Sequence, residues 1–198
     1  GLLSASFQPD SMTRTLRSIV RHRKNLVRMS AGYINRMQKA LELMNIKLHT
    51  IISDIDGKTG RLIIEAILNG ERDPQVLADL RDKRIKASRE DIIKSLEGNW
   101  TTEHLFELKQ CYQLYCYHHQ MIDECDKEIE KQLIEQLASK NEGLITDLPI
   151  VKRKTVKKNR VDFELTSYLK EIIGVDVTEV VGLSEITVLS IMSEVGLD

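Results

Sequence analysis

The feature that most constrains the fold is a heptad pattern of side chains between Met12 and Ile52. One apolar stripe recurs at every seventh residue, at Val20, Val27, Ile34, Leu41 and Leu48. A second stripe, in register with it three residues on, contains Leu16, Arg23, Ser30, Met37, Met44 and Ile51. A seven-residue repeat held over this length predicts one long helix that packs against a partner helix as in a coiled coil.

The same segment is strongly basic, with nine lysines and arginines against a single acid, Glu42. Such a surface attracts a polyanion such as nucleic acid, although a solvated coiled-coil face is an equally simple interpretation. The residues expected to contact phosphates are Arg21, Arg23, Lys24, Arg28, Arg36 and Lys39. Arg23 and Ser30 also interrupt an apolar stripe, where a polar residue sets the register or the oligomeric state of a coil.

The formal net charge of −1 conceals this segregation, because the segment from Thr102 to Lys140 is acidic and a later run is basic again. The aromatic content of 5% suits long helices better than a β-sandwich. Three cysteines, an odd number, indicate a reducing compartment and no disulfide framework. No apolar run reaches membrane-spanning length and no signal peptide is visible, so we expect a cytoplasmic protein without membrane partners.

Turn and cap residues divide the rest of the chain into further helices. Short helices are expected at 59–69, 73–80 and 88–98, and a second long helix from Thr102 to Ser139. The stripe of this second long helix is Leu105, Leu108, Tyr112, Tyr115, His119, Ile122, Ile129 and Leu133. Two long helices of similar length predict an all-α fold, an elongated antiparallel coiled coil over 12–140 with a small helical head at about 53–101.

Beyond the second long helix, residues 141–162 form an expected basic linker. Its cations are Lys152, Arg153, Lys154, Lys157, Lys158 and Arg160, and phosphate contact is one interpretation of them. Residues 163–198 contain two expected helices, 163–173 and 184–195, around Gly182. This arrangement is similar to a helix-hairpin-helix, whose turn at Gly182 can hold a phosphate, but a plain helical hairpin fits the same residues.

Several stretches together resemble the DEDD transposases of bacterial insertion sequences, the insertion-sequence one-ten family. The first ten residues, Gly1 to Asp10, resemble the segment that follows the last catalytic acids of that family. Further stretches of this chain resemble the middle region of the family. They are Arg21–Arg23, Met37–Leu41, Met44-Asn45, Ser53–Ile55, Gly57, Thr59-Gly60, Gly70–Pro74, Leu80–Asp82, Glu103-His104, Leu108–Gln110 and Cys125-Asp126.

The resemblance implies a middle region of a larger enzyme. In the family, an RNase-H-like domain with an acidic Mg²⁺ site precedes the coiled coil, and a domain with a nucleophilic serine follows it. We therefore expect residues 1–11 to be the tail of the first domain and 163–198 to begin the last one. Neither motif is present, so no catalytic residue and no cofactor is assigned here, and the chain alone is expected to be inactive.

Two groups of residues look like metal sites, but structural roles are the favoured interpretation of both. Cys111 and Cys125 would lie about four helical turns apart, too far to share one ion, so core and surface roles are favoured for the cysteines and for His118 and His119. Asp54 and Asp56 beside Gly57 lack the remaining spacing of a calcium loop.

The sequence thus favours a dimerising, nucleic-acid-binding scaffold of a transposase in the bacterial cytoplasm, associated with the nucleoid. Its expected partners are element DNA, guide RNA and further copies of itself, in a homodimer or a larger homo-oligomer. The alternative is a coiled-coil adaptor that binds only proteins. A standalone hydrolase is disfavoured, because no cluster of acids, histidines or cysteines could support it.

Overall fold

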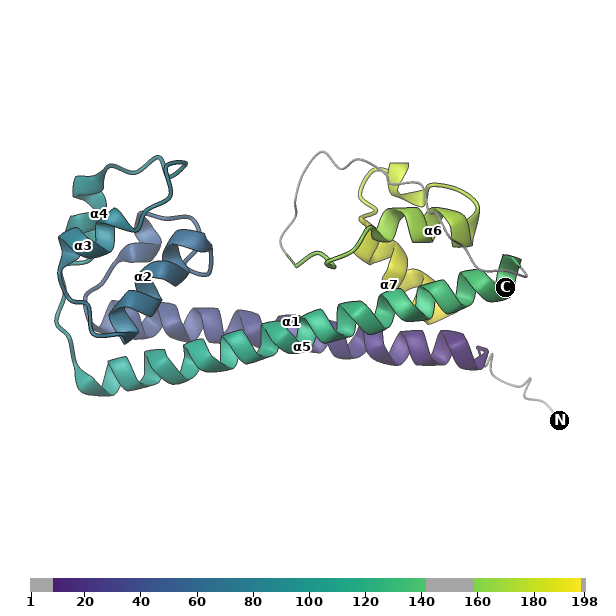
Figure 1. Ribbon diagram of the computed structural model, residues 1–198, viewed down its shortest axis with the longest axis horizontal. Coiled ribbons are helices and arrows are strands. Elements are labelled where there is room, and N and C mark those ends of the chain that lie inside the picture. The colour runs from purple at the N-terminus through teal and green to yellow at the C-terminus, as the bar shows by residue number, and fades with distance from the viewer. Residues whose placement is uncertain (1–8, 142–158, 197–198) are drawn as a thin grey trace, which may run out of the picture. The chain divides into compact units, whose positions relative to one another are not determined.

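The computed structural model describes residues 9–141 and 159–196, and all regular structure in these two ranges is helical, without a strand (Figure 1). The α-helices are α1 (Ser11–Leu43), α2 (Lys58–Leu68), α3 (Pro74–Asp79), α4 (Arg89–Ser95), α5 (Thr102–Asn141), α6 (Leu165–Ile173) and α7 (Glu185–Val195). Two 3-10 helices, η1 (Leu48–Thr50) and η2 (Val177–Glu179), complete the set. The predicted all-α class is confirmed.

The chain forms two compact units. Unit 2 is the continuous segment Arg28–His118, and unit 1 contains the residues up to Val27 together with those from His119 onward. Helices α1 and α5 therefore contribute one part to each unit. No helix in the described ranges has both the length and the apolar character that a bilayer crossing requires.

The first long helix is shorter than the sequence predicted, because α1 ends at Leu43 and not at Ile52. Asn45 adopts a left-handed conformation with φ of 61°. The amide of Ile46 then donates to the Leu41 carbonyl at 2.9 Å, which closes the helix in the manner of a Schellman motif. The heptad continues in the sequence but not in the helix, since Leu48 belongs to η1 and Ile51 follows it.

Unit 2 has one buried apolar core. Met37 of α1, Met44 directly after it, Ile63 of α2, Ile92 of α4 and Leu108 of α5 are all completely buried in it. The loops between these helices leave no room for larger residues at two glycines. A β-carbon on Gly60 would come within 2.1 Å of the Ile55 carbonyl oxygen, and one on Gly98 within 2.3 Å of the Met44 carbonyl oxygen.

The cap residues of the short helices behave as their sequence predicts. The Asp73 carboxylate accepts the Gln75 amide at 2.9 Å, directly before Pro74 at the first position of α3. Ser88 accepts the amide of Asp91 at 3.0 Å and opens α4. The expected helix at 88–98 is nevertheless shorter, since α4 stops at Ser95.

Unit 1 has its own core, which joins α6 and α7 to the long helices. Its buried members include Leu16 of α1, Leu133 of α5, Leu169 of α6 and Leu189 of α7. The sequence predicted that residues 163–198 begin a separate domain after a linker. The described residues 159–196 share a core and a unit with the first part of α1 and the last part of α5, and their place at the start of a further domain stays a prediction.

The buried stripe of α5 differs in part from the predicted one. Cys111, His118 and Cys125 are buried at heptad spacing, whereas Tyr112 and His119 are only half-buried. The His118 ring lies 5.1 Å from that of Tyr33, and its Nδ1 is 2.8 Å from the Leu114 carbonyl oxygen. Cysteine and histidine fill core positions here, which a search for aliphatic residues alone does not find.

The remaining residues that were predicted to pack in the coil divide into two groups. The buried group is Val20, Leu41, Leu48, Leu108, Tyr115, Ile122, Ile129 and Leu133. The half-buried group is Val27, Ile34, Leu105 and Tyr112. At the first of these positions the neighbour Leu26 is the buried residue, in a small cluster with Ile122 and Cys125.

Candidate nucleic-acid interface

The cations of α1 lie on one face of the helix. They are spaced alternately three and four residues apart over Arg14, Arg17, Arg21, Lys24 and Arg28, and Lys39 lies eleven residues beyond the last of these. This spacing keeps them on one face, which flanks the buried stripe that contains Leu16 and Val20. All of them are exposed except Arg17, which is half-buried. The face is a single feature of the sequence, but the structure uses its two parts differently.

In unit 1, this face is occupied by the C-terminal end of α7. Arg17 donates from Nε to the Ser193 carbonyl at 3.0 Å and from its terminal nitrogen to the Glu194 carbonyl at 2.6 Å. Arg21 holds the Glu194 carboxylate with two hydrogen bonds of 2.7 and 2.6 Å. Cations suit this place because the last carbonyls of a helix lack intrahelical donors and carry a partial negative charge. Arg17 and Arg21 therefore already have a structural role.

These contacts also change the pKa of the Glu194 carboxyl. The hydrogen bonds from Arg21, with its charge and those of Arg17 and Lys24, lower the pKa of Glu194 below its ordinary value. Lys24 itself is exposed and has no hydrogen bond or ion pair among the described residues. It lines a cavity of about 350 Å³ beside Val20, Ile186 and Leu189.

Arg23 does not belong to the exposed face, and its assignment as a phosphate contact is wrong. Only 5% of Arg23 and 2% of Asp126 are exposed, and the two side chains form a bidentate pair. The guanidinium also donates to the carbonyls of Asn159 at 3.2 Å and Arg160 at 3.0 Å. Asp126 in turn accepts the Asp162 amide at 3.2 Å. Four of its five N–H groups are used inside unit 1, which leaves the guanidinium poorly placed to bind a phosphate.

The buried pair explains why a charged residue occupies an apolar stripe. Burial raises the pKa of the Asp126 carboxyl, and the hydrogen bonds from Arg23 act against that rise. The pair ties α1, α5 and the segment 159–162 together at one point. Arg23, which was expected at a nucleic acid, is thus buried in unit 1 and donates to the backbone carbonyl of Arg160, a second cation of that expectation.

Arg160 is also held by a structural partner. Its guanidinium makes a bidentate pair with Glu185, the first residue of α7, and Thr166 donates to the same carboxylate at 3.0 Å. The side chain of Arg160 is only 14% exposed. The other predicted linker cations, Lys152, Arg153, Lys154, Lys157 and Lys158, lie outside the described residues.

Gly182 lies in an exposed turn, as predicted, with φ of 93°. The amide of Leu183 donates to the Val180 carbonyl at 3.1 Å across this turn. The first turn of α7 then carries the Ser184 cap, which accepts the Thr187 amide at 3.2 Å, and the Glu185 carboxylate. A capped helix start beside a carboxylate is a poor phosphate site, because the carboxylate repels the anion. The connection is also longer than a simple hairpin, since η2 lies within it.

In unit 2, the cations of α1 have no structural partner. Arg28, Arg36 and Lys39 are exposed, and none of them makes a hydrogen bond or an ion pair in the part of the chain that the structure describes. Glu42, the one acid nearby in sequence, binds Gln38 at 3.1 Å and His49 at 3.2 Å. These three cations remain available to an external anion, as do the exposed Arg14 and Lys24 of unit 1.

Sequence reasoning missed other cations that the fold gathers in unit 2. Lys58, Arg84 and Lys86 line one cavity, although Lys58 begins α2 and the other two lie in the loop before α4. No periodicity joins them, so only the fold brings them together. Among the described residues, no group of three histidines, cysteines or acids is placed to hold a metal ion.

Comparisons with protein-family models, with curated proteins and with solved structures found no match to this chain.

Proposed function

We propose that this chain is a nucleic-acid-binding helical scaffold of a DEDD insertion-sequence transposase. The observation that carries the nucleic-acid role is the exposed group Arg28, Arg36 and Lys39, which has no partner among the described residues. The resemblance of the sequence to the family supplies the biological context. The proposed ligands are guide RNA and element DNA, in the bacterial cytoplasm at the nucleoid.

The mechanism of binding follows from electrostatics. Each lysine or arginine that neutralises a phosphate releases a counterion, so affinity falls steeply as salt rises. Contacts of this type position a nucleic acid but do not read its sequence. The scaffold therefore holds the nucleic acid in place, and base pairing or other domains select the target.

The proposed architecture is an antiparallel coiled coil of α1 and α5 that dimerises or forms a larger homo-oligomer. The order of contacts in unit 1 supports the antiparallel direction. Leu26, late in this part of α1, clusters with Ile122, whereas Leu16, early in α1, shares a core with Leu137, late in α5. Catalysis, with Mg²⁺, belongs to other parts of the proposed parent enzyme, and this chain contributes no catalytic residue.

A second candidate function is a protein-binding adaptor, which a separate observation favours. Phe106, Leu114 and Tyr117 of α5 are 61%, 41% and 57% exposed, although all three are large and apolar. They lie within twelve residues of one helix, as side chains at a protein contact do. Both an adaptor and a scaffold could have these exposed apolar side chains. The two functions are therefore distinguished by whether the chain binds nucleic acid.

A fluorescence-anisotropy titration over a salt series makes that discrimination. Labelled RNA from the element and a labelled element-end DNA duplex are titrated with the purified chain. Tight binding that weakens steeply with salt supports the scaffold. Absence of binding to both at low salt contradicts it and favours the adaptor, whose self-association through apolar residues survives high salt. Cleavage of element-end DNA by the purified chain with Mg²⁺ would contradict the assignment of catalysis elsewhere.

A further inference from the structure

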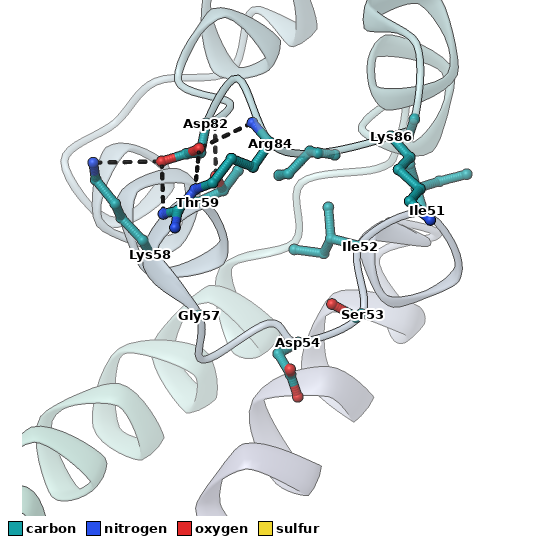
Figure 2. A pocket seen from close by; sticks show the side chains of 12 residues that line it. Ile51, Ile52, Ser53, Asp54, Gly57, Lys58, Thr59, Asp82, Arg84 and Lys86 are labelled. Atoms are coloured by element: carbon teal, nitrogen blue, oxygen red, sulfur yellow. Dashed lines mark hydrogen bonds and ion pairs between the residues drawn. The ribbon is translucent and has the colours of Figure 1, made fainter. Parts of the chain in front are cut away.

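A cavity of about 620 Å³ opens in unit 2 between two loop regions (Figure 2). One wall is formed by residues 51–54 and the start of α2, and the other by residues 82–87. The volume lies within the range of roughly 300–1,000 Å³ that small-molecule sites occupy. Neither the heptads nor the cations of α1 contribute to it.

The charged side chains of this cavity lie on two of its sides. On one side the Asp82 carboxylate receives Arg84 Nε at 3.0 Å and lies 3.5 Å from Lys58 Nζ. Lys86 lies on the opposite side, beside Ile51 (Figure 2). The remaining acid, Asp54, directs its carboxylate away from the other lining side chains in the same view. Three cations therefore line the hollow, two beside the Asp82 carboxylate and Lys86 across from it.

The Asp82 group keeps one positive charge in excess, since two cations share one carboxylate. The side chains of Lys58 and Arg84 are 70% and 86% exposed, so either can turn to a ligand while the other holds Asp82. The hydrogen bonds from Arg84, with its charge and that of Lys58, keep the pKa of Asp82 far below its ordinary value.

The lining between the two cationic sides of the cavity is apolar. Ile51, Ile52, Ile85 and Ala87 line it, and Ile52 is 5% exposed. A flat apolar ring that enters the cavity would be covered by these side chains while its charged substituents stay at the rim. An apolar surface between cations can cover a base and hold its phosphates, whereas known sites for single-stranded nucleic acid commonly stack the bases on aromatic side chains.

The cavity is built on a rigid frame. The Asp82 amide donates to the Thr59 hydroxyl at 2.9 Å, and Thr59 is itself buried. Gly60 allows α2 to begin directly against the Ile55 carbonyl, where no larger residue fits. The two walls are therefore joined through Thr59 and Asp82, so a ligand would meet a preformed shape, which lowers the entropic cost of binding.

From this geometry we infer that the cavity binds one nucleotide of a single-stranded nucleic acid. The base lies against Ile51, Ile52 and Ile85, and the phosphates on its two sides contact Lys58 or Arg84 and Lys86. A strand fits better than a free nucleotide, because the cations lie on opposite sides of the wall, as successive phosphates lie on either side of a base. The inference rests on the proposed function and assigns it a second contact surface, separate from α1.

The first test is a crosslinking experiment with the whole chain. Single-stranded RNA 12-mers that each carry one 4-thiouridine are bound, irradiated and digested, and the crosslinked peptides are identified by mass spectrometry. The inference predicts crosslinks within residues 51–59 or 82–87. Binding with crosslinks only outside these ranges overturns it and leaves the proposed function intact, whereas absence of any binding overturns both.

The second test uses matched variants in an anisotropy titration of the same RNA. Lys58→Ala with Lys86→Ala lowers the slope of log affinity against log salt by about 1.4, at about 0.7 for each lost phosphate contact. Lys94→Ala with Lys109→Ala removes the same charge from exposed positions outside the cavity and changes the slope by less. Equal slopes for the two variants would overturn the inference.

A third variant tests the cavity itself without changing the charge. Ser53→Trp places a large ring at an exposed lining position, and we expect it to weaken RNA binding severalfold with an unchanged far-ultraviolet circular dichroism spectrum. Unchanged affinity would count against occupation of the hollow. Uridine monophosphate serves as the last probe, and binding as tight as that of the 12-mer would replace the strand by a free nucleotide.

Discussion

The two parts of the cationic face of α1 have the same residue chemistry and different surroundings. In unit 1, Arg17 and Arg21 hold the end of α7, while in unit 2 Arg28 and Lys39 have no partner among the described residues. A basic helix in a sequence therefore does not by itself define a binding surface. The fold determines which of its cations serve the protein and which are left for a ligand. The predictions below separate the two units in order of decreasing effect.

The largest expected effect is the destabilisation of unit 1 when Asp126, the buried partner of Arg23, is removed. Asp126→Ala leaves Arg23 buried and unpaired, which should lower the free energy of unfolding by about 3–5 kcal/mol. Hydrogen exchange should show lost protection in α6 and α7 before α2. The double variant Arg23→Met with Asp126→Leu removes both charges and should recover most of the stability. Equal loss of protection in both units would contradict the division of the chain into independent cores.

A glycine substitution should destabilise unit 2 in place of unit 1. In Gly60→Ala the new β-carbon meets the Ile55 carbonyl at 2.1 Å, so α2 must move. We expect a loss of roughly 3 kcal/mol, the upper end of the usual cost of overpacking a core. Hydrogen exchange again locates the damage, here in α2 and α4. Wild-type stability of this variant would show that the loop before α2 is not held as the structure describes.

Substitution of Gly32 in α1 should instead stabilise the protein. Gly32 is exposed within the helix, and a β-carbon there meets no atom within 4 Å. Gly32→Ala should therefore stabilise the protein by about 0.5–1 kcal/mol, because alanine loses less backbone entropy in a helix. Thermal unfolding would measure the gain. A loss of stability would indicate an unrecognised contact at this face of α1.

The smallest expected effect concerns pH. Because folding lowers the pKa of Glu194 through Arg21, its stabilising contribution is complete above the ordinary value of 4.5. It is lost as the pH falls through the lowered value in the folded protein. Urea unfolding of wild type and Arg21→Ala should therefore differ at pH 6 and converge towards pH 3. A difference that grows on acidification would contradict the ion pair.

Local signals in the sequence predicted the helices well, because they depend on neighbouring residues. Asp73 and Ser88 cap helices where their positions indicated, and Pro74 begins α3. The end of α1 was missed because the apolar heptad continues beyond Leu43 although Asn45 reverses the chain. An asparagine able to take a left-handed conformation was the one local sign of that end.

The functional assignments depended on contacts that no local pattern contains. Arg23 looked like its basic neighbours in sequence, yet its partner Asp126 lies 103 residues away. Its place in the apolar stripe was the available signal, since a charge at such a position requires a buried partner. The partners of Arg17 and Arg21 lie on α7, at least 173 residues further along the chain, and therefore could be found only in the folded structure.

The most direct test of the central claim compares the two parts of the cationic face in one binding experiment. Anisotropy of labelled RNA is measured over a salt series with Arg28→Ala, Arg36→Ala and Lys39→Ala combined, and separately with Arg17→Ala and Arg21→Ala combined. The account predicts that the first set lowers the slope of log affinity against log salt by roughly 2, at about 0.7 per contact, while the second leaves it unchanged. An equal or greater loss of slope with the second set would contradict it.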